Sequence, residues 1–105
     1  MDVFHTEGAA LLIRAILSLQ TDEECRAFLE DLMTGKEIQD CGQRLMVAKL
    51  LSEQMIYSRI AEATGASSAT ISRVNRSLNY GMGAYRIIFD RMKEDEQKQQ
   101  EEPQA

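Results

Sequence analysis

The run from Tyr57 to Leu78, YSRIAEATGASSATISRVNRSL, constrains the fold of this chain more than any other feature. Gly65 divides it into two short segments, and glycine suits a tight turn because it has no Cβ to clash in a left-handed backbone conformation. Ala61 supplies the small residue that is needed where two helices touch, and Ile71 and Val74 are spaced to point back onto the first helix. The run therefore predicts a helix-turn-helix whose two helices span roughly residues 57–63 and 67–77.

The second helix of this pair carries small, polar and basic side chains between its apolar positions. Two serines open it and are good N-cap residues, and no acidic residue occurs from Gly65 to Phe89. This is the chemistry of a helix laid in the major groove, where it contacts base edges and phosphates. The alternative interpretation is a helical hairpin that only packs. The candidate DNA contacts are Ser58, Arg59, Ser67, Ser68, Thr70, Ser72, Arg73, Asn75 and Arg76.

These candidates have different expected roles. The best candidates for base-edge contacts are hydroxyl residues at the start of the second helix, the end that enters the groove: Ser67, Ser68 and Thr70. Hydroxyl groups donate or accept, so they do not indicate which base is read. Arg59 and Arg76 are placed to reach phosphates on either side of the second helix. For Arg59 the alternative is a side chain that only faces solvent, and for Arg76 it is an ion pair between subunits. For Ser58 we expect a cap on the first helix, with a phosphate contact as the alternative.

The run MIYSRIAEATGASSATISRVNRSL resembles the DNA-reading segment of the Trp repressor family. The strongest matches are Gly65-Ala66, Ala69 to Arg73, and Ser77-Leu78. The resemblance is dense from Gln54 to Leu78 and extends over roughly Thr6 to Met92, and the whole chain is similar to the YerC/YecD branch of that family. It implies an all-α, intertwined helical homodimer with a helix-turn-helix that binds operator DNA. It also implies that Arg73 contacts the phosphate backbone and a bound amino acid.

The same resemblance implies an effector pocket beside the second helix. In the family, a glycine next to the matching arginine borders the indole ring of tryptophan, whereas here Val74 holds that position and its branched side chain occupies the space that a planar ring needs. A second family arginine matches either Gln43 or Arg44, depending on a one-residue shift in the alignment. We therefore expect no small-molecule effector, or one other than tryptophan. The candidate effector residues are Gln43, Arg44, Arg73, Val74 and Ser77.

The charge distribution agrees with this interpretation better than the net charge of −5 does. Acidic residues concentrate in residues 21–31 and 93–105, whereas residues 55–91 carry arginines and only two acids, Glu62 and Asp90. A basic middle between two acidic parts favours a specific DNA binder over an architectural coat. For the acidic helix, simple solvation of the surface is the alternative.

Helical periodicity, with a single proline at Pro103, predicts one all-α domain over residues 1–93. We expect dimerisation helices within residues 6–53, the helix-turn-helix at 57–78, a C-terminal helix at 83–93, and a charged, disordered tail at 94–105. Thr21 with Glu24 and Thr34 with Glu37 match the capping box that begins a helix. The first helix is apolar on nearly every side, as expected for a helix that a second copy also covers.

Other classes of function have little support in the residues. His5 is the only histidine and has no visible nucleophile partner, and no glycine-rich phosphate loop or Cys/His spacing for zinc occurs. Cys25 and Cys41 fall within helical apolar patterns and are expected to be buried thiols. No stretch reaches the ~18 apolar residues of a membrane span, and we expect no secretion signal because residues 6–19 lack its basic start and small-residue cleavage site. We expect no enzyme, cofactor, metal or membrane partner, and a cytoplasmic location.

The expected function is therefore that of a sequence-specific DNA-binding transcriptional regulator, most simply a repressor, acting as a homodimer on a near-palindromic operator. Two alternatives remain open at this stage. One is a DNA-binding module without a regulatory role, and the other is a protein–protein interaction dimer whose basic face meets an acidic partner.

Overall fold

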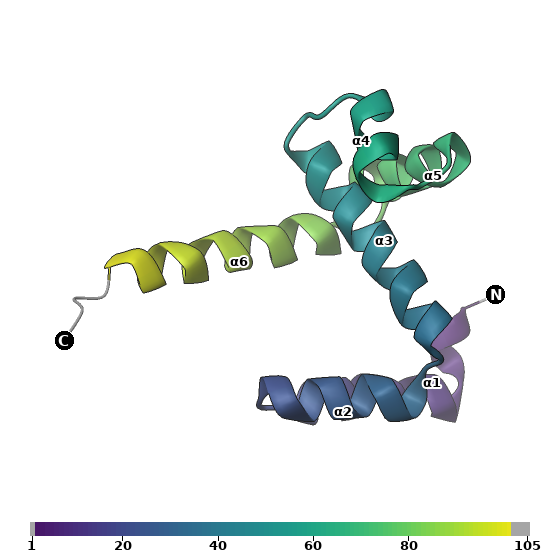
Figure 1. Cartoon of the computed structure of the whole chain (residues 1–105). Helices are drawn as coiled ribbons and strands as arrows, with labels where there is room; N and C mark the ends of the chain where they lie inside the picture. The colour runs from purple at the N-terminus through teal and green to yellow at the C-terminus, as the bar shows by residue number, and fades with distance from the viewer. Residues whose placement is uncertain (1, 102–105) are drawn as a thin grey trace. The chain divides into compact units, whose positions relative to one another are not determined.

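The computed structural model describes residues 2–101, and these form helices joined by short connections, with no strand among them. In chain order the elements are η1 (Val3–His5), α1 (Glu7–Ser18), α2 (Asp22–Leu32), α3 (Gly35–Ser52), α4 (Tyr57–Thr64), α5 (Ser68–Tyr80) and α6 (Ala84–Glu101) (Figure 1). The all-α expectation is confirmed. The described chain divides between Ile38 and Gln39 into two compact units. The single domain that we expected over residues 1–93 stays a prediction.

Three threonines begin the first three α-helices, and the sequence predicts two of them, Thr21 and Thr34. The hydroxyl oxygen of Thr6 accepts a hydrogen bond from the Ala9 N–H at 3.1 Å, and Thr21 does the same for Glu24 at 3.1 Å. The capping box is complete at Thr34, because Oε1 of Glu37 also accepts from the Thr34 N–H at 2.9 Å. Each cap provides a partner for an N–H group that helix geometry leaves without one.

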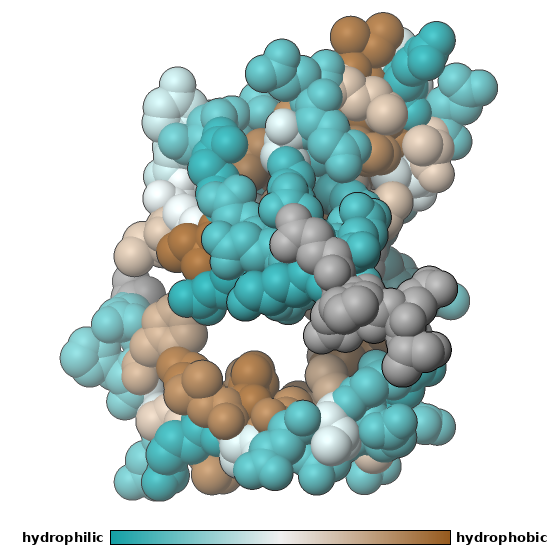
Figure 2. Space-filling view, turned by 90° about the vertical axis from the view of Figure 1, so that its left-hand side faces the viewer, coloured by the Kyte–Doolittle hydropathy of each residue, from teal (hydrophilic) through white to brown (hydrophobic). Residues whose placement is uncertain are grey.

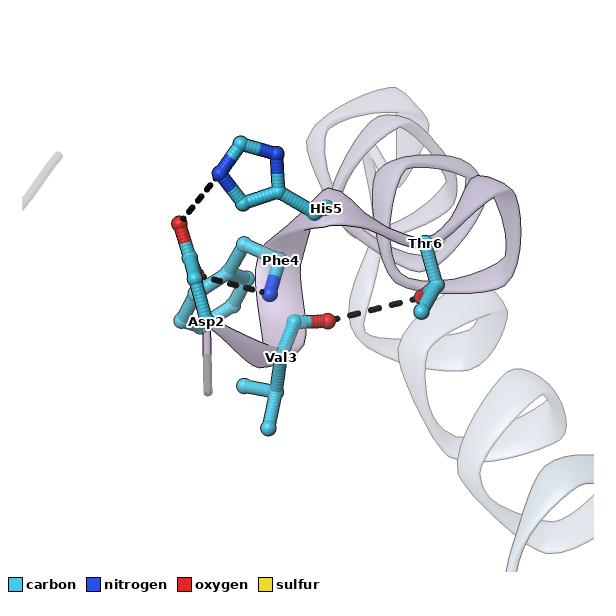
Figure 3. Close-up of polar contacts among 5 residues, drawn as sticks. All are labelled: Asp2, Val3, Phe4, His5 and Thr6. Carbon is cyan, nitrogen blue, oxygen red and sulfur yellow. Dashed lines mark hydrogen bonds and ion pairs between the residues drawn. The ribbon is translucent and has the colours of Figure 1, made fainter.

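The short turn η1 precedes α1 and is held by contacts among neighbouring residues (Figure 3). Oδ1 of Asp2 accepts from the Phe4 N–H at 2.9 Å, and Oδ2 lies 3.1 Å from Nε2 of His5. The hydroxyl of Thr6 donates to the Val3 carbonyl at 3.4 Å. His5 thus pairs with a carboxylate of its own turn, at the surface.

The first unit leaves many of its apolar residues exposed, and neither α1 nor α2 contains a buried residue. Figure 2 shows hydrophobic side chains gathered over these helices at the bottom of the view. The exposed large apolar residues on α1 and α2 are Leu11, Leu12, Ile13, Ile16, Leu17, Leu29 and Leu32. Cys25 is exposed as well, so the expectation of a buried thiol there is wrong for the single chain, while Cys41 is half-buried. Within the described residues, α2 contains no buried residue, and Cys25 shares that exposure.

The second unit has a core, to which α3, α4, α5, α6 and the turn between α4 and α5 all contribute. Its largest fully buried side chains are Val47, Ile60 and Ile71, one from each of α3, α4 and α5. Burial of this kind stabilises by about 1.5–3 kcal/mol per large aliphatic side chain. Gly42 does not interrupt α3, which runs unbroken past it. The complete core cluster is Val47, Ala48, Ile60, Ala66, Ile71, Val74 and Phe89.

The end of α3 turns the chain into the helix-turn-helix without a glycine. Gln54 has a positive φ of 65°, its N–H donates to the Leu51 carbonyl at 2.9 Å, and the Met55 N–H donates to the Leu50 carbonyl at 3.0 Å. This pair of bonds is the Schellman arrangement that ends many helices. The two residues whose apolar contact often accompanies this arrangement, Leu50 and Met55, both pack against the core.

Two boundaries near the C-terminus differ from the expected ones. The helix α5 continues to Tyr80, where we expected a connection from Asn79, and α6 begins at Ala84. The tail expected to be disordered from residue 94 is helical as far as Glu101, and residues 102–105 lie outside the described part. Residues 94–101 are rich in Glu and Gln, which are strong helix formers, and contain neither glycine nor proline.

Candidate nucleic-acid interface

The turn between α4 and α5 depends on Gly65, as the sequence predicts. Gly65 ends α4 with a φ of 73°, and its N–H donates to the Ala61 carbonyl at 2.8 Å. A residue with a Cβ would lose about 1–2 kcal/mol in this left-handed conformation. The next residue, Ala66, is buried in the core. The turn therefore fixes how α5 leaves α4.

A second set of bonds holds the end of α4 from the side of α3. The hydroxyl of Thr64 donates to the Ile60 carbonyl at 2.7 Å and accepts from the Ala66 N–H at 3.2 Å. From α3, Nε2 of Gln43 donates to the Thr64 carbonyl at 3.1 Å. Gln43, which the sequence placed in a candidate effector pocket, thus also joins α3 to the helix-turn-helix. Its partner is distant in the sequence, so no local pattern pointed to this bond.

The helix α5 begins at a cap that uses most of the Ser67 side chain. Oγ of Ser67 accepts from the Thr70 N–H at 3.1 Å and donates to the Thr70 hydroxyl oxygen, also at 3.1 Å. The single hydroxyl proton of Ser67 is therefore engaged, whereas Ser68 is exposed at the first position of the helix. Of these serines, Ser68 is the one left open to an external partner.

The expectation that Ser58 caps α4 is wrong. The N-cap is Ile56, with an extended backbone at φ −73° and ψ 153°, and no side chain accepts a hydrogen bond at this cap. Ser58 lies two residues inside the helix and is exposed. The alternative role that the sequence left for it, contact with an external phosphate, requires that exposure.

The remaining candidate contacts divide α5 into two faces. Ile71, Val74 and Leu78 are buried, whereas Ser72, Arg73 and Arg76 are exposed and Thr70 and Asn75 are half-buried. Arg59 on α4 is exposed too. Three arginines against one glutamate, Glu62, give residues 57–80 a formal charge of 3 − 1 = +2. The helix is thus anchored by its apolar face and presents hydroxyl and guanidinium groups on the opposite one.

A half-open pocket of about 240 Å³ lies between α3 and α5. It brings together Gln43, Arg44, Arg73 and Val74, so both residues that the alignment left as alternatives line it, while Ser77 does not. Thr70, which we assigned to base reading, also faces this pocket. Asp40 also lines the pocket but was not among the predicted residues, although it precedes Gln43 and Arg44 by three and four residues and so lies on the same face of α3. The lining residues are Asp40, Gln43, Arg44, Thr70, Arg73 and Val74.

A polar network joins the second half of α5 to α6. Nη2 of Arg86 donates to Oδ1 of Asn79 at 3.1 Å. Nδ2 of Asn79 donates to Oδ1 of Asn75 at 2.9 Å and to the Asn75 carbonyl at 3.0 Å. The network crosses the connection at Gly81, where a Cβ would clash with the Ser77 carbonyl oxygen, so this connection requires glycine.

The described residues offer neither a metal site nor a helix that could span a membrane. No group of three or more His, Cys, Asp or Glu side chains in residues 2–101 is arranged to hold a metal ion. Within the same range, no helix combines the length and apolar character needed to cross a membrane.

Comparison with known proteins decides the family. The family model of the Trp repressor protein matches residues 7–93. The chain belongs to the Trp repressor family. YerC, an uncharacterized protein of Bacillus subtilis (strain 168), is 54% identical over 85 residues, which make up 81% of this chain and 82% of YerC. Membership in this family supports DNA binding and transcription regulation as the general function.

Two solved structures confirm the Trp repressor-like fold. A TrpR-like protein from Eubacterium eligens gives a TM-score of 0.84 at 48% sequence identity, and the match covers 89% of this chain and 96% of that protein. A candidate Trp repressor from Staphylococcus aureus gives a TM-score of 0.79 at 49% identity, over 89% of this chain and 95% of that protein.

Proposed function

We propose that this protein is a sequence-specific transcriptional regulator, most simply a repressor, that binds a near-palindromic operator as a homodimer. The observation that carries the proposal is the construction of α5. Its apolar face is fixed in the core by Ile71, Val74 and Leu78, and its other face presents exposed serines and arginines with no carboxylate between residues 65 and 89. A helix of this kind is suited to the major groove.

The contacts that we propose for α5 are assigned from the exposure and the functional group of each side chain. Ser68 and Ser72 are exposed hydroxyl residues on α5 and are assigned to base edges, together with the half-buried Thr70 at the edge of the pocket. Arg73 and Arg76 are exposed and are assigned to phosphate oxygens. Ser67 acts mainly as the cap that fixes the start of α5, because its hydroxyl group already serves Thr70.

Phosphate contacts are also assigned to α4, through the exposed Ser58 and Arg59. The acidic helix α2 and the charged end of α6 are assigned no DNA contact. Their carboxylates repel phosphate, so they lower the affinity for DNA in general while a specific set of contacts outweighs them.

The homodimer is supported by the uncovered apolar side chains of α1 and α2. Leu17 is 78% exposed and Leu11 is 59% exposed, and a groove of about 210 Å³ between the helices is lined mainly by apolar residues. Covering each of these half-exposed side chains would contribute on the order of 1 kcal/mol. The family fold implies that a second copy of the chain provides the cover.

The pocket between α3 and α5 is where the family resemblance places a small-molecule effector. The pocket of about 240 Å³ between α3 and α5 is below the range of ~300–1,000 Å³ typical of small-molecule sites. Val74 is only 4% exposed, so its side chain fills space next to Arg73. We propose that L-tryptophan is not the effector, and calorimetry that detects saturable L-tryptophan binding at micromolar levels would contradict this.

The proposed function is tested by selecting genomic DNA fragments with the purified protein at near-physiological salt, with and without L-tryptophan. We expect one two-fold symmetric site to be enriched in both conditions. Binding with a steep salt dependence but no enriched site would instead support a DNA-binding module without a regulatory role. No DNA binding from a protein that is folded and dimeric would support the protein-interaction alternative.

A further inference from the structure

We propose that Arg86 and Asn79 are positioning residues that fix the side-chain amide of Asn75 with its NH₂ group outward, so that Asn75 serves α5 as a hydrogen-bond donor to DNA. This inference rests on the proposed DNA-binding function and deepens it, because it assigns a direction of hydrogen bonding to one contact. It also gives α6 a part in DNA recognition without a contact of its own.

The direction is set at Arg86, whose guanidinium group contains donors and no acceptor. Nη2 of Arg86 lies 3.1 Å from the side chain of Asn79, and only the oxygen of that amide can face it. The NH₂ group of Asn79 must therefore point the other way. It does so toward Asn75, where it donates to Oδ1 at 2.9 Å and to the backbone carbonyl at 3.0 Å.

The NH₂ group of Asn79 in turn fixes the orientation of the Asn75 side-chain amide. Because Asn79 presents NH₂ hydrogens, Asn75 must turn its amide oxygen toward Asn79, since the opposite orientation would set two donors against each other. The amide nitrogen of Asn75 is left for an external partner, and no described residue accepts a hydrogen bond from it. Asn75 is half-buried, which limits the number of orientations its side chain can take.

The position of Asn75 suits a contact to DNA. Ser68, Ser72 and Asn75 follow one another at spacings of four and three residues, so they lie on the same face of α5. An outward NH₂ group matches the acceptors of DNA, which are the phosphate oxygens and, in the major groove, N7 and O6 of guanine, N7 of adenine and O4 of thymine. An outward carbonyl oxygen would be repelled by all of them.

The network also depends on the joint between the helices. Arg86 reaches Asn79 across the connection that contains Gly81, where a Cβ would clash with the Ser77 carbonyl oxygen, and Gly83, which has a φ of 84°. The two glycines permit the turn, and the bond from Arg86 then joins the first turn of α6 to the last turns of α5. The amide of Asn75 is thus held from outside its own helix.

The experiment measures affinity for the selected operator with a matched pair of variants. Arg86→Met removes the donor, and Arg91→Met removes an equal charge from an exposed position of α6 outside the network. We expect Arg86→Met to bind about tenfold more weakly than Arg91→Met, the size of one hydrogen bond to a charged acceptor. Arg86→Lys, which keeps a donor, should restore most of the affinity.

A double-mutant cycle separates positioning from direct contact. In an Asn75→Ala background, Arg86→Met should bind no more weakly than Arg91→Met. Asn79→Asp keeps an acceptor for Arg86 but cannot donate to Asn75, so it should weaken binding in the original background more than in the Asn75→Ala background. This variant also provides the test if Arg86→Met does not fold.

Nuclear magnetic resonance of the free protein gives a readout that does not involve DNA. Arg86→Met should shift the side-chain amide resonances of Asn75 and Asn79, and Arg91→Met should leave both unchanged. Equal affinities of Arg86→Met and Arg91→Met, or an undiminished loss in the Asn75→Ala background, would overturn the inference while leaving the proposed function intact. If the original protein shows no site preference, the proposed function itself fails.

Discussion

Replacing Ser67 by alanine should lower the stability of the protein, whereas replacing its neighbour Ser68 should not. Oγ of Ser67 accepts the N–H of Thr70 at 3.1 Å and caps α5, while Ser68 is exposed at the first helical position and makes no side-chain bond within the described residues. The two serines are adjacent and chemically identical, so each is the control for the other.

The expected decrease in the free energy of unfolding of Ser67→Ala is that of losing one N-cap. Substituting a serine N-cap by alanine costs about 1 kcal/mol. The bond from the Ser67 hydroxyl to the Thr70 hydroxyl is solvent-exposed and adds little. Ser68→Ala replaces an exposed side chain and should change the free energy of unfolding by less than about 0.5 kcal/mol.

Urea unfolding followed by far-ultraviolet circular dichroism measures both variants. Protein concentration must be the same throughout, because dimerisation would make stability depend on it. With a slope of about 2 kcal/mol per molar urea, Ser67→Ala should lower the midpoint by about 0.5 M. The affinity for the operator should show the reverse order, with Ser68→Ala the weaker binder. Equal midpoints for the two variants would refute the assignment of Ser67 as the cap.

Four further predictions follow from single residues. Gln54→Gly should raise the free energy of unfolding by about 1 kcal/mol, since glycine adopts a φ of 65° without strain, and urea unfolding measures this. Gly81→Ala should lower it by about 1–3 kcal/mol in the same assay, because the added Cβ clashes with the Ser77 carbonyl oxygen. Arg73→Ala should weaken binding to every DNA sequence and reduce the salt slope by about 1 per subunit; an unchanged slope in fluorescence anisotropy titrations would remove Arg73 from the phosphate contacts. Leu17→Glu changes a side chain that is 78% exposed in the single chain, so it should shift the sedimentation of the protein toward the monomer without unfolding α1.

The sequence predicted those parts of the fold that depend on local chemistry. Gly65 was identified as the left-handed turn residue because glycine is favoured there, and Thr34 with Glu37 was identified as a capping box by spacing alone. The apolar residues Ile71 and Val74 were assigned to the inner face of α5 by helical periodicity. In each case, the residues that decide the structure are within one or two turns of each other.

Features that depend on distant residues or on competing local choices were not predicted. We expected Ser58 to cap α4, but the N-cap is Ile56, which has an extended backbone and makes no side-chain cap bond. Isoleucine is a poor N-cap by propensity, so the sequence did not indicate this position. Gln54 adopts the left-handed conformation that glycine favours, and the residues on either side of this turn, Leu50 and Met55, pack against the core. The bond from Gln43 to Thr64 joins residues of different helices, and no periodicity reports such a pair.

In the proposed complex, two copies of α5, related by two-fold symmetry, enter successive major grooves of one operator. Hydroxyl-radical footprinting on the site selected from genomic fragments tests it most directly. We predict two equivalent protected patches whose centres lie about one helical turn apart, ~34–36 Å, and that weaken together in Arg73→Ala. A single protected patch, or uniform protection that follows the DNA without a centre of symmetry, would contradict the account.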